Sequence, residues 1–213
     1  MQFPFSDMRQ KTLLKIIGLM RTKIVGGLTI LEISKKLRIG YRPAYNHISE
    51  MEKEGIIQVD KIGSAKQCKL DFSSPKTKHL LESLDIARKE ELYKEYPKLK
   101  IIDNLIAKLT EKFISEIHSI VLFGSYAKGT ATKHSDIDLL FIVSDLKDKN
   151  LRESIERESA IYQYSHNIKI SPLITDIEEF KKMLKSKELN VGREVKEYGI
   201  SLYGHEIFWR ITA

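Results

Sequence analysis

Hydrophobic residues recur at helical spacing along the first third of the chain. The spacing predicts helices over residues 10–20, 28–37 and 43–55. In the second helix, Thr29 stands where an N-cap residue is expected, and Glu32 follows three residues later, as in a capping box. The pattern therefore predicts a small helical domain at the start of the chain.

A turn and a hairpin complete this region. The second and third helices are separated by Arg38-Ile39-Gly40, where Gly40 is expected to take a turn conformation that other residues adopt only with strain. Two strand-like runs, residues 56–61 and 67–72, surround Gly63-Ser64 and predict a β-hairpin. Helix, turn, helix and hairpin in this order resemble a winged helix-turn-helix DNA-binding domain.

The rest of the chain predicts an α+β fold. Helical spacing continues over residues 77–94 and 97–116, and Pro97 divides the two stretches because the residue before a proline is pushed out of the helical region. Short apolar strands then alternate with helices, which predicts a second domain. The predicted parts are residues 1–75, a helical connector over residues 76–96, and residues 97–213.

Composition and charge narrow the class of protein. The 213 residues are 42% hydrophobic, enough for a packed core, and the single Cys68 excludes an internal disulfide and a cysteine-based zinc site. No apolar run reaches the length of a membrane span, so we expect a cytoplasmic protein with no membrane partner. The net charge is +7, and residues 1–75 hold 13 basic against 7 acidic side chains, which favours a polyanion partner for that part.

Residues 118–143, HSIVLFGSYAKGTATKHSDIDLLFIV, hold the candidate chemistry. Asp136 and Asp138 are two apart, so on a strand they point to the same face. Two neighbouring carboxylates repel unless a cation neutralises them, and oxygen ligands suit Mg²⁺ (or Mn²⁺), whose coordination substrate phosphates complete. Gly124 would let the backbone approach a phosphate, and Ser125 offers a hydroxyl and a backbone N–H at an expected helix start.

Two short patterns are present: G-S-x-A-x-G in Gly124, Ser125, Ala127 and Gly129, and S-D-x-D in Ser135, Asp136 and Asp138. Residues 97–213 resemble the polymerase-beta-like nucleotidyltransferase superfamily, most closely its minimal branch. The resemblance implies a mixed sheet flanked by helices, and transfer of a nucleoside monophosphate from an NTP, with ATP as the expected donor, to a protein or small-molecule acceptor. It also implies two catalytic metal ligands, Asp136 and Asp138, and nucleotide binding by Gly124, Ser125, Lys128, Gly129 and Ser135.

A third carboxylate belongs to such a site in the family, on a later strand expected at residues 167–175. The outward positions of that strand hold Lys169 and Ser171, and neither is acidic. Either Asp176 or Glu178 bends back to replace the missing group, or the site binds nucleotide and metal without efficient transfer. Lys169 could also mimic a cation in a degenerate site.

The resemblance to winged helices implies double-stranded DNA as a partner. One function is then a Mg²⁺-dependent nucleotidyltransferase fused to a DNA-binding module, and the alternative is a transcriptional regulator that binds nucleotide without turnover. A homodimer and a neighbouring HEPN toxin are further partners left open. The expected DNA-contacting residues are Arg42, Tyr45, Asn46 and His47 near base edges, and Lys53, Lys61 and Lys66 at phosphates.

Overall fold

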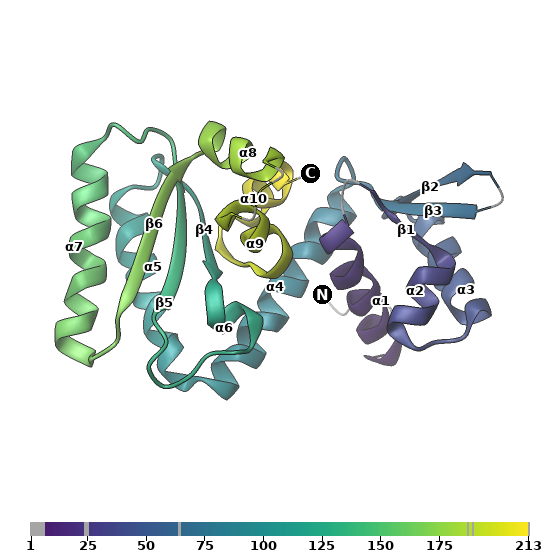
Figure 1. Cartoon of the computed structure of the whole chain (residues 1–213), viewed down its shortest axis with the longest axis horizontal. Helices are drawn as coiled ribbons and strands as arrows, with labels where there is room; N and C mark the ends of the chain where they lie inside the picture. The colour runs from purple at the N-terminus through teal and green to yellow at the C-terminus, as the bar shows by residue number, and fades with distance from the viewer. Residues whose placement is uncertain (1–6, 24–25, 64, 187, 189, 213) are drawn as a thin grey trace. The chain divides into compact units, whose positions relative to one another are not determined.

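The computed structural model describes residues 7–23, 26–63, 65–186, 188 and 190–212, and it forms two compact units (Figure 1). The first unit extends to Leu84, and the second unit is Asp85–Thr212. The division falls within one helix, α4, Pro75–Glu95. The three-part division at residues 75 and 96 stays a prediction. In the part of the chain that the structure describes, no helix has the length and apolar character needed to cross a membrane.

The first unit combines three helices with a small antiparallel sheet of strand order β1-β3-β2. The predicted hairpin is confirmed as β2 and β3, although Ser64 of its loop lies outside the described residues. The short strand β1, which the sequence pattern did not predict, pairs with β3. The elements are α1 (Asp7–Met20), η1 (Arg21–Lys23), β1 (Leu28–Thr29), α2 (Ile30–Leu37), α3 (Tyr41–Lys53), β2 (Ile57–Ile62) and β3 (Ala65–Leu70).

The turn between α2 and α3 corrects one expectation. The capping box is confirmed, because the Thr29 hydroxyl accepts from the Glu32 N–H and the Glu32 carboxylate accepts from the Thr29 N–H. Gly40, however, is extended at φ −60° and serves as the N-cap of α3, whereas Arg38 takes the left-handed conformation at φ 53°. Backbone hydrogen bonds from Arg38 to the last turn of α2 offset the strain of a non-glycine residue there.

The second unit is a four-stranded mixed sheet, β6-β5-β4-β7, in which only β5 and β6 run parallel. Helices α5 and α7 cover one face, and α8, α9 and α10 cover the other (Figure 1). The elements are η2 (Pro97–Lys100), α5 (Ile101–Lys112), β4 (Ile117–Phe123), α6 (Gly124–Lys128), β5 (Ile137–Val143), α7 (Lys149–His166), β6 (Ile170–Asp176), α8 (Ile177–Lys185), α9 (Val191–Tyr198), β7 (Ile200–Tyr203) and α10 (His205–Thr212).

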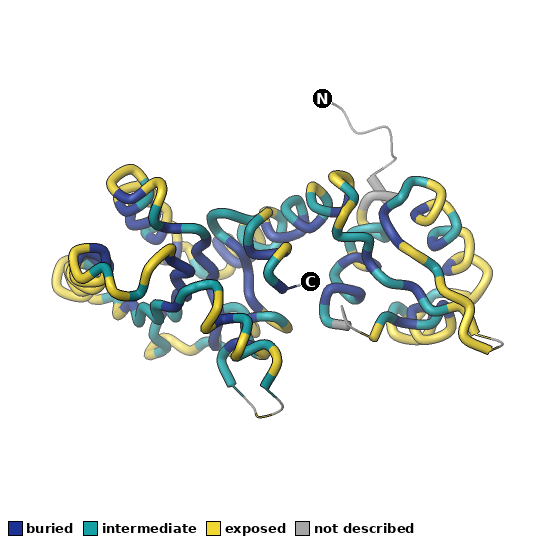
Figure 2. Tube along the Cα trace, turned by 90° about the horizontal axis from the view of Figure 1, so that it is seen from above, coloured by how far each residue is buried: buried dark blue, intermediate teal, exposed yellow. Residues whose placement is uncertain are grey.

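Burial follows this layering. Strands β4 and β5 are buried almost throughout, since helices cover both faces of the sheet. In the first unit, by contrast, the end of β2 and the start of β3, which form the tip of the hairpin, are exposed (Figure 2). The α5-side core takes the odd-numbered residues of β5, from Ile137 to Val143. The even-numbered positions, including Asp138, therefore face α8, α9 and α10.

A buried carboxylate joins α4 to α10 within the second unit. Asp85 is 0% exposed, and its Oδ2 accepts a 2.9 Å hydrogen bond from the indole N–H of Trp209. The guanidinium of Arg88 lies 3.9 Å from Oδ1, and the imidazole of His205 lies 3.8 Å from Oδ2. Removal of this carboxylate would leave a buried indole donor without this acceptor.

We therefore expect Asp85→Ala to lower the free energy of unfolding of the second unit by about 2–3 kcal/mol. The fluorescence of Trp209, the chain's one tryptophan, measures this during urea unfolding. Asp85→Asn keeps an oxygen that can accept from the indole and should lose less. An Asp85→Ala protein that unfolds at the same urea concentration as the wild type would show that this hydrogen bond does not stabilise the unit.

Candidate active site

Strand β5 positions the two candidate metal-binding carboxylates. Asp138 is its second residue, in register with Phe123 of β4 and Ser171 of β6. Asp136 precedes the strand, held in place by the hydrogen bond from the Ile137 N–H to the Lys169 carbonyl oxygen, 2.9 Å. Both carboxylates therefore lie at the same end of the sheet, as the D-x-D spacing predicts.

Gly124 packs directly against Asp138. Its φ is +70°, and a Cβ atom built on it would lie 1.9 Å from Asp138 Oδ2. The end of β4 and the start of β5 are adjacent in the sheet, so the turn from β4 into α6 has to pass beside this carboxylate. Glycine is required here both by the left-handed backbone and by the absence of space. Ser125 follows as the second residue of α6 and is half-buried.

The site combines opposing charges. Burial raises the pKa of Asp138 above its usual value, and the negative charges of Asp136 and Glu194 raise it further. The positive charges of Lys169 and Lys128 act in the opposite direction and lower it. The two lysines therefore offset part of the repulsion that the acidic neighbours exert on the Asp138 carboxylate.

Glu194 of α9 is the charged residue of the site that sequence reasoning missed. Its Oε1 lies 2.9 Å from Lys128 Nζ, and the Lys128 ammonium also lies 5.7 Å from the centre of the Tyr198 ring. Glu194 follows the D-x-D motif by more than fifty residues and belongs to no recognised motif. Only the packing of α9 on the sheet brings it near Asp138, so no signal in the sequence could have identified it.

The loop between α6 and β5 is held by its own side chains. The hydroxyl of Ser135 accepts a 2.9 Å hydrogen bond from the Thr132 N–H, and Gly129 ends α6 with a left-handed φ of 71°. Outside this loop, at the end of α9, the guanidinium of Arg88 donates to the carbonyl oxygens of Tyr198 and Gly199, each at 2.8 Å. Ser135 thus orders the loop before Asp136, and its contact with nucleotide stays a prediction.

The suggestion that Asp176 or Glu178 replaces the third carboxylate is wrong. Asp176 is in register with Val143, at the opposite end of β5 from Asp138. Five residues along a strand correspond to roughly 16 Å. The Asp176 carboxylate caps α8 by accepting from the Glu179 N–H at 2.7 Å, and Glu178 lies in the first turn of that helix.

Asp136 and Asp138 are a ligand set that a divalent ion could use together with substrate phosphates. Across residues 7–23, 26–63, 65–186, 188 and 190–212, no group of three or more His, Cys, Asp or Glu side chains could hold a metal. Mg²⁺ is commonly bound through one or two protein carboxylates together with substrate phosphates and water. Asp136 and Asp138 supply that number of carboxylates.

In the first unit, α3 separates a buried face from an exposed one. Ala44, Ile48 and Met51 are buried, whereas Arg42, Tyr45 and Asn46 are exposed and His47 is half-buried. Lys53 ends α3, and Lys61 and Lys66 stand opposite one another near the tip of the hairpin, all three exposed. The ammonium of Lys66 lies 5.0 Å from the centre of the Tyr45 ring, so the hairpin and α3 share one surface.

Known proteins resemble part of this chain. The nucleotidyltransferase domain family matches residues 102–196. A candidate protein adenylyltransferase of Methanocaldococcus jannaschii, MJ1305, is 34% identical over 112 residues, which are 52% of this chain and 74% of the relative. The chain belongs to the nucleotidyltransferase domain family. A second candidate protein adenylyltransferase of that organism, MJ0141, is 27% identical to this chain over 104 residues, 49% of this chain and 97% of the relative.

Solved structures also match part of this chain, with low scores. A crystal structure of a toxin–antitoxin with AMP-PNP has a TM-score of 0.35 and 24% identity, over 51% of this chain and 82% of that chain. A mutant of the toxin–antitoxin MntA–HpeT has a TM-score of 0.34 and 25% identity, over 52% and 81%. Because both scores are low, the family assignment rests on the sequence relatives.

Two glycines test the packing of the site. A Cβ atom at position 129 would have no neighbour within 4 Å. Gly129→Ala should therefore lower the free energy of unfolding by about 1 kcal/mol, from backbone strain alone. Gly124→Ala has the same strain and also collides with Asp138, so we expect an additional loss of ~1–3 kcal/mol in the free energy of unfolding. Urea titrations followed by Trp209 fluorescence compare the two. Equal losses would mean that the Asp138 carboxylate does not lie against Gly124.

Proposed function

We propose that the chain is an adenylyltransferase that transfers AMP from ATP to a hydroxyl group of a protein, with Mg²⁺ (or Mn²⁺). The observation that carries the proposal is the close packing of the Gly124 turn against Asp138, beside Asp136, at the start of β5. This arrangement supports a site in which a triphosphate on the turn meets a metal ion on the carboxylates. The names of the two M. jannaschii relatives support a protein acceptor.

The residues have separate tasks in this scheme. Asp136 and Asp138 would hold the divalent ion, which when bound neutralises phosphate charge and makes the α-phosphorus more electrophilic. The turn at Gly124 passes beside Asp138, and the hydroxyl of Ser125, the next residue, would donate to a phosphate bound there. Lys128 exchanges its partner Glu194 for the β- and γ-phosphates, because a triphosphate carries more negative charge than one carboxylate.

The reaction is an in-line displacement at phosphorus. A bond forms between the acceptor oxygen and the α-phosphorus of ATP, and the bond from that phosphorus to the bridging oxygen of the β-phosphate breaks. Pyrophosphate leaves, and the hydroxyl proton passes to solvent. Because such transfer depends mainly on positioning and charge neutralisation, the carboxylate pair and the cations near it should account for most of the rate.

Replacement of the carboxylate pair tests this proposal. The double variant Asp136→Asn with Asp138→Asn should lose more than about 100-fold of the transfer of label from ATP labelled at the α-phosphate, because the metal loses both protein ligands. Glu178→Gln removes one exposed carboxylate elsewhere in the same unit and should retain wild-type transfer.

Unchanged labelling in the double variant would contradict this assignment of the site. Nucleotide binding by the wild type without any transfer would favour the alternative, a regulator that senses nucleotide.

We also infer that residues 1–75 form a winged helix-turn-helix module that binds double-stranded DNA. The observation that favours it is the pairing of Lys61 directly opposite Lys66 across the hairpin. Like charges directly opposite one another destabilise a sheet unless an anion lies near them. Phosphates of DNA would be such anions, while Arg42, Tyr45 and Asn46 on the exposed face of α3 would approach base edges.

A mixed-sequence DNA duplex tests the module. The logarithm of the binding constant should fall linearly with the logarithm of salt concentration, and Lys61→Ala with Lys66→Ala should reduce that slope by about 2, one for each lost phosphate contact. Fluorescence anisotropy over a salt series measures both slopes.

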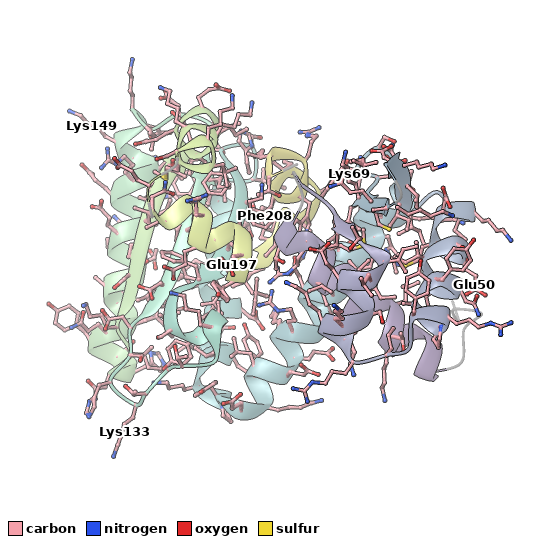
Figure 3. All side chains as sticks on the ribbon, turned by 45° about the vertical axis from the view of Figure 1, so that its right-hand side comes forward. Glu50, Lys69, Lys133, Lys149, Glu197 and Phe208 are labelled. Carbon is pink, nitrogen blue, oxygen red and sulfur yellow. The ribbon has the colours of Figure 1, made fainter. Side chains whose placement is uncertain are left out.

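Two lysines of the second unit provide the control. Lys133→Ala with Lys149→Ala removes the same charge from exposed positions that point into solvent (Figure 3), and the slope should not change. The absence of any duplex binding at low salt would contradict the DNA-binding role.

A further inference from the structure

Lys169 directly contacts one of the two candidate metal ligands. Its Nζ lies 2.5 Å from Asp136 Oδ2, and the hydroxyl of Ser171 donates to the same oxygen at 3.2 Å. The backbone fixes this arrangement, because the Lys169 carbonyl oxygen accepts the Ile137 N–H at 2.9 Å. The backbone pairing of β5 with the segment that leads into β6 therefore holds the two residues together. The ion pair does not depend on the two side chains alone.

The ion pair lies on the segment where the resemblance to the family predicts a third carboxylate. Ser171 is in register with Asp138, so the segment of β6 beside the site offers one hydroxyl and one ammonium and no carboxylate. Two divalent ions a few ångströms apart need several anionic ligands to offset their mutual repulsion. Among the described residues, no group of three or more acidic, His or Cys side chains could hold a metal ion, which leaves Asp136 and Asp138 as the carboxylates for it. The third carboxylate near Asp138, that of Glu194, is paired with Lys128, and Asp136 already has a cation on it.

We propose that the Lys169 ammonium is a resident cation that takes the place of one divalent ion, so that the active site binds one ion with the nucleotide instead of two. This inference rests on the proposed nucleotidyl transfer at the same site. Lys169 neutralises Oδ2 of Asp136, which leaves Oδ1 of Asp136 and the Asp138 carboxylate to bind the single ion. The absence of a third carboxylate at positions 169 and 171 agrees with this inference, because a site with one divalent ion fewer needs one negative ligand fewer.

The contact is open to substrate. The side chain of Lys169 is 56% exposed and that of Asp136 is 33% exposed, so neither group is closed off in the core. A bound nucleotide can therefore reach the pair, and replacement of Lys169 should not disturb the packing of the unit. These properties allow a test by substitution without loss of the fold.

The test counts Mn²⁺ ions in the complex with a non-hydrolysable ATP analogue, by electron paramagnetic resonance of free and bound Mn²⁺. We expect one bound Mn²⁺ for each analogue in the wild type and in Lys169→Arg, which keeps the cation. Lys169→Asp removes the cation and adds the third carboxylate, so two Mn²⁺ ions should bind for each analogue. Because the readout is stoichiometry, it does not depend on turnover.

Lys149→Asp is the matched control. It makes the same charge reversal at an exposed residue of α7 that extends into solvent (Figure 3), and the count should stay at one. Two Mn²⁺ ions in the wild type, or one in Lys169→Asp, would overturn this inference and leave the proposed transfer standing. Failure of the wild type to bind the analogue with Mn²⁺ would overturn both.

Discussion

Electrostatic repulsion between Asp136 and Asp138 is the constraint on which the candidate active site depends. Two neighbouring carboxylates at the start of β5 repel each other, and nearby cations reduce that repulsion. The surrounding structure supplies those cations from different elements: Lys169 beside β6 and Lys128 at the end of α6. The arrangement of the second unit, with β5 between β4 and β6, is what brings these charges together.

The local features of this site could be predicted from the sequence, but its long-range contacts could not. The D-x-D spacing predicts two carboxylates on one face because side chains alternate along a strand, and the Gly124 turn follows from the motif around it. Glu194 could not be predicted, since its approach to Asp138 depends on how α9 packs against the sheet. The absence of an acidic residue at positions 169 and 171 was visible in the sequence, whereas the contact of Lys169 with Asp136 required the structure.

In the first unit, too, some features could be predicted from the sequence and others could not. The capping box of Thr29 and Glu32 is a local interaction of three residues' separation, and it could be predicted. The turn after α2 was predicted with the wrong residue, because glycine is the usual left-handed residue and Arg38 takes that conformation instead. Hydrogen bonds to the carbonyl oxygens of α2 outweigh the intrinsic preference there. The strand β1 has only two residues, too few for a hydrophobic period to indicate it.

The proposed reaction moves the AMP group of ATP, which carries the α-phosphate, to a protein hydroxyl. The most direct measurement incubates the chain with a cell lysate, Mg²⁺ and ATP labelled either at the α-phosphate or at the γ-phosphate. We expect protein-bound label from the α position alone, with one pyrophosphate released for each label transferred. Protein-bound label from the γ-phosphate, or nucleotide binding with no labelled protein, would contradict it.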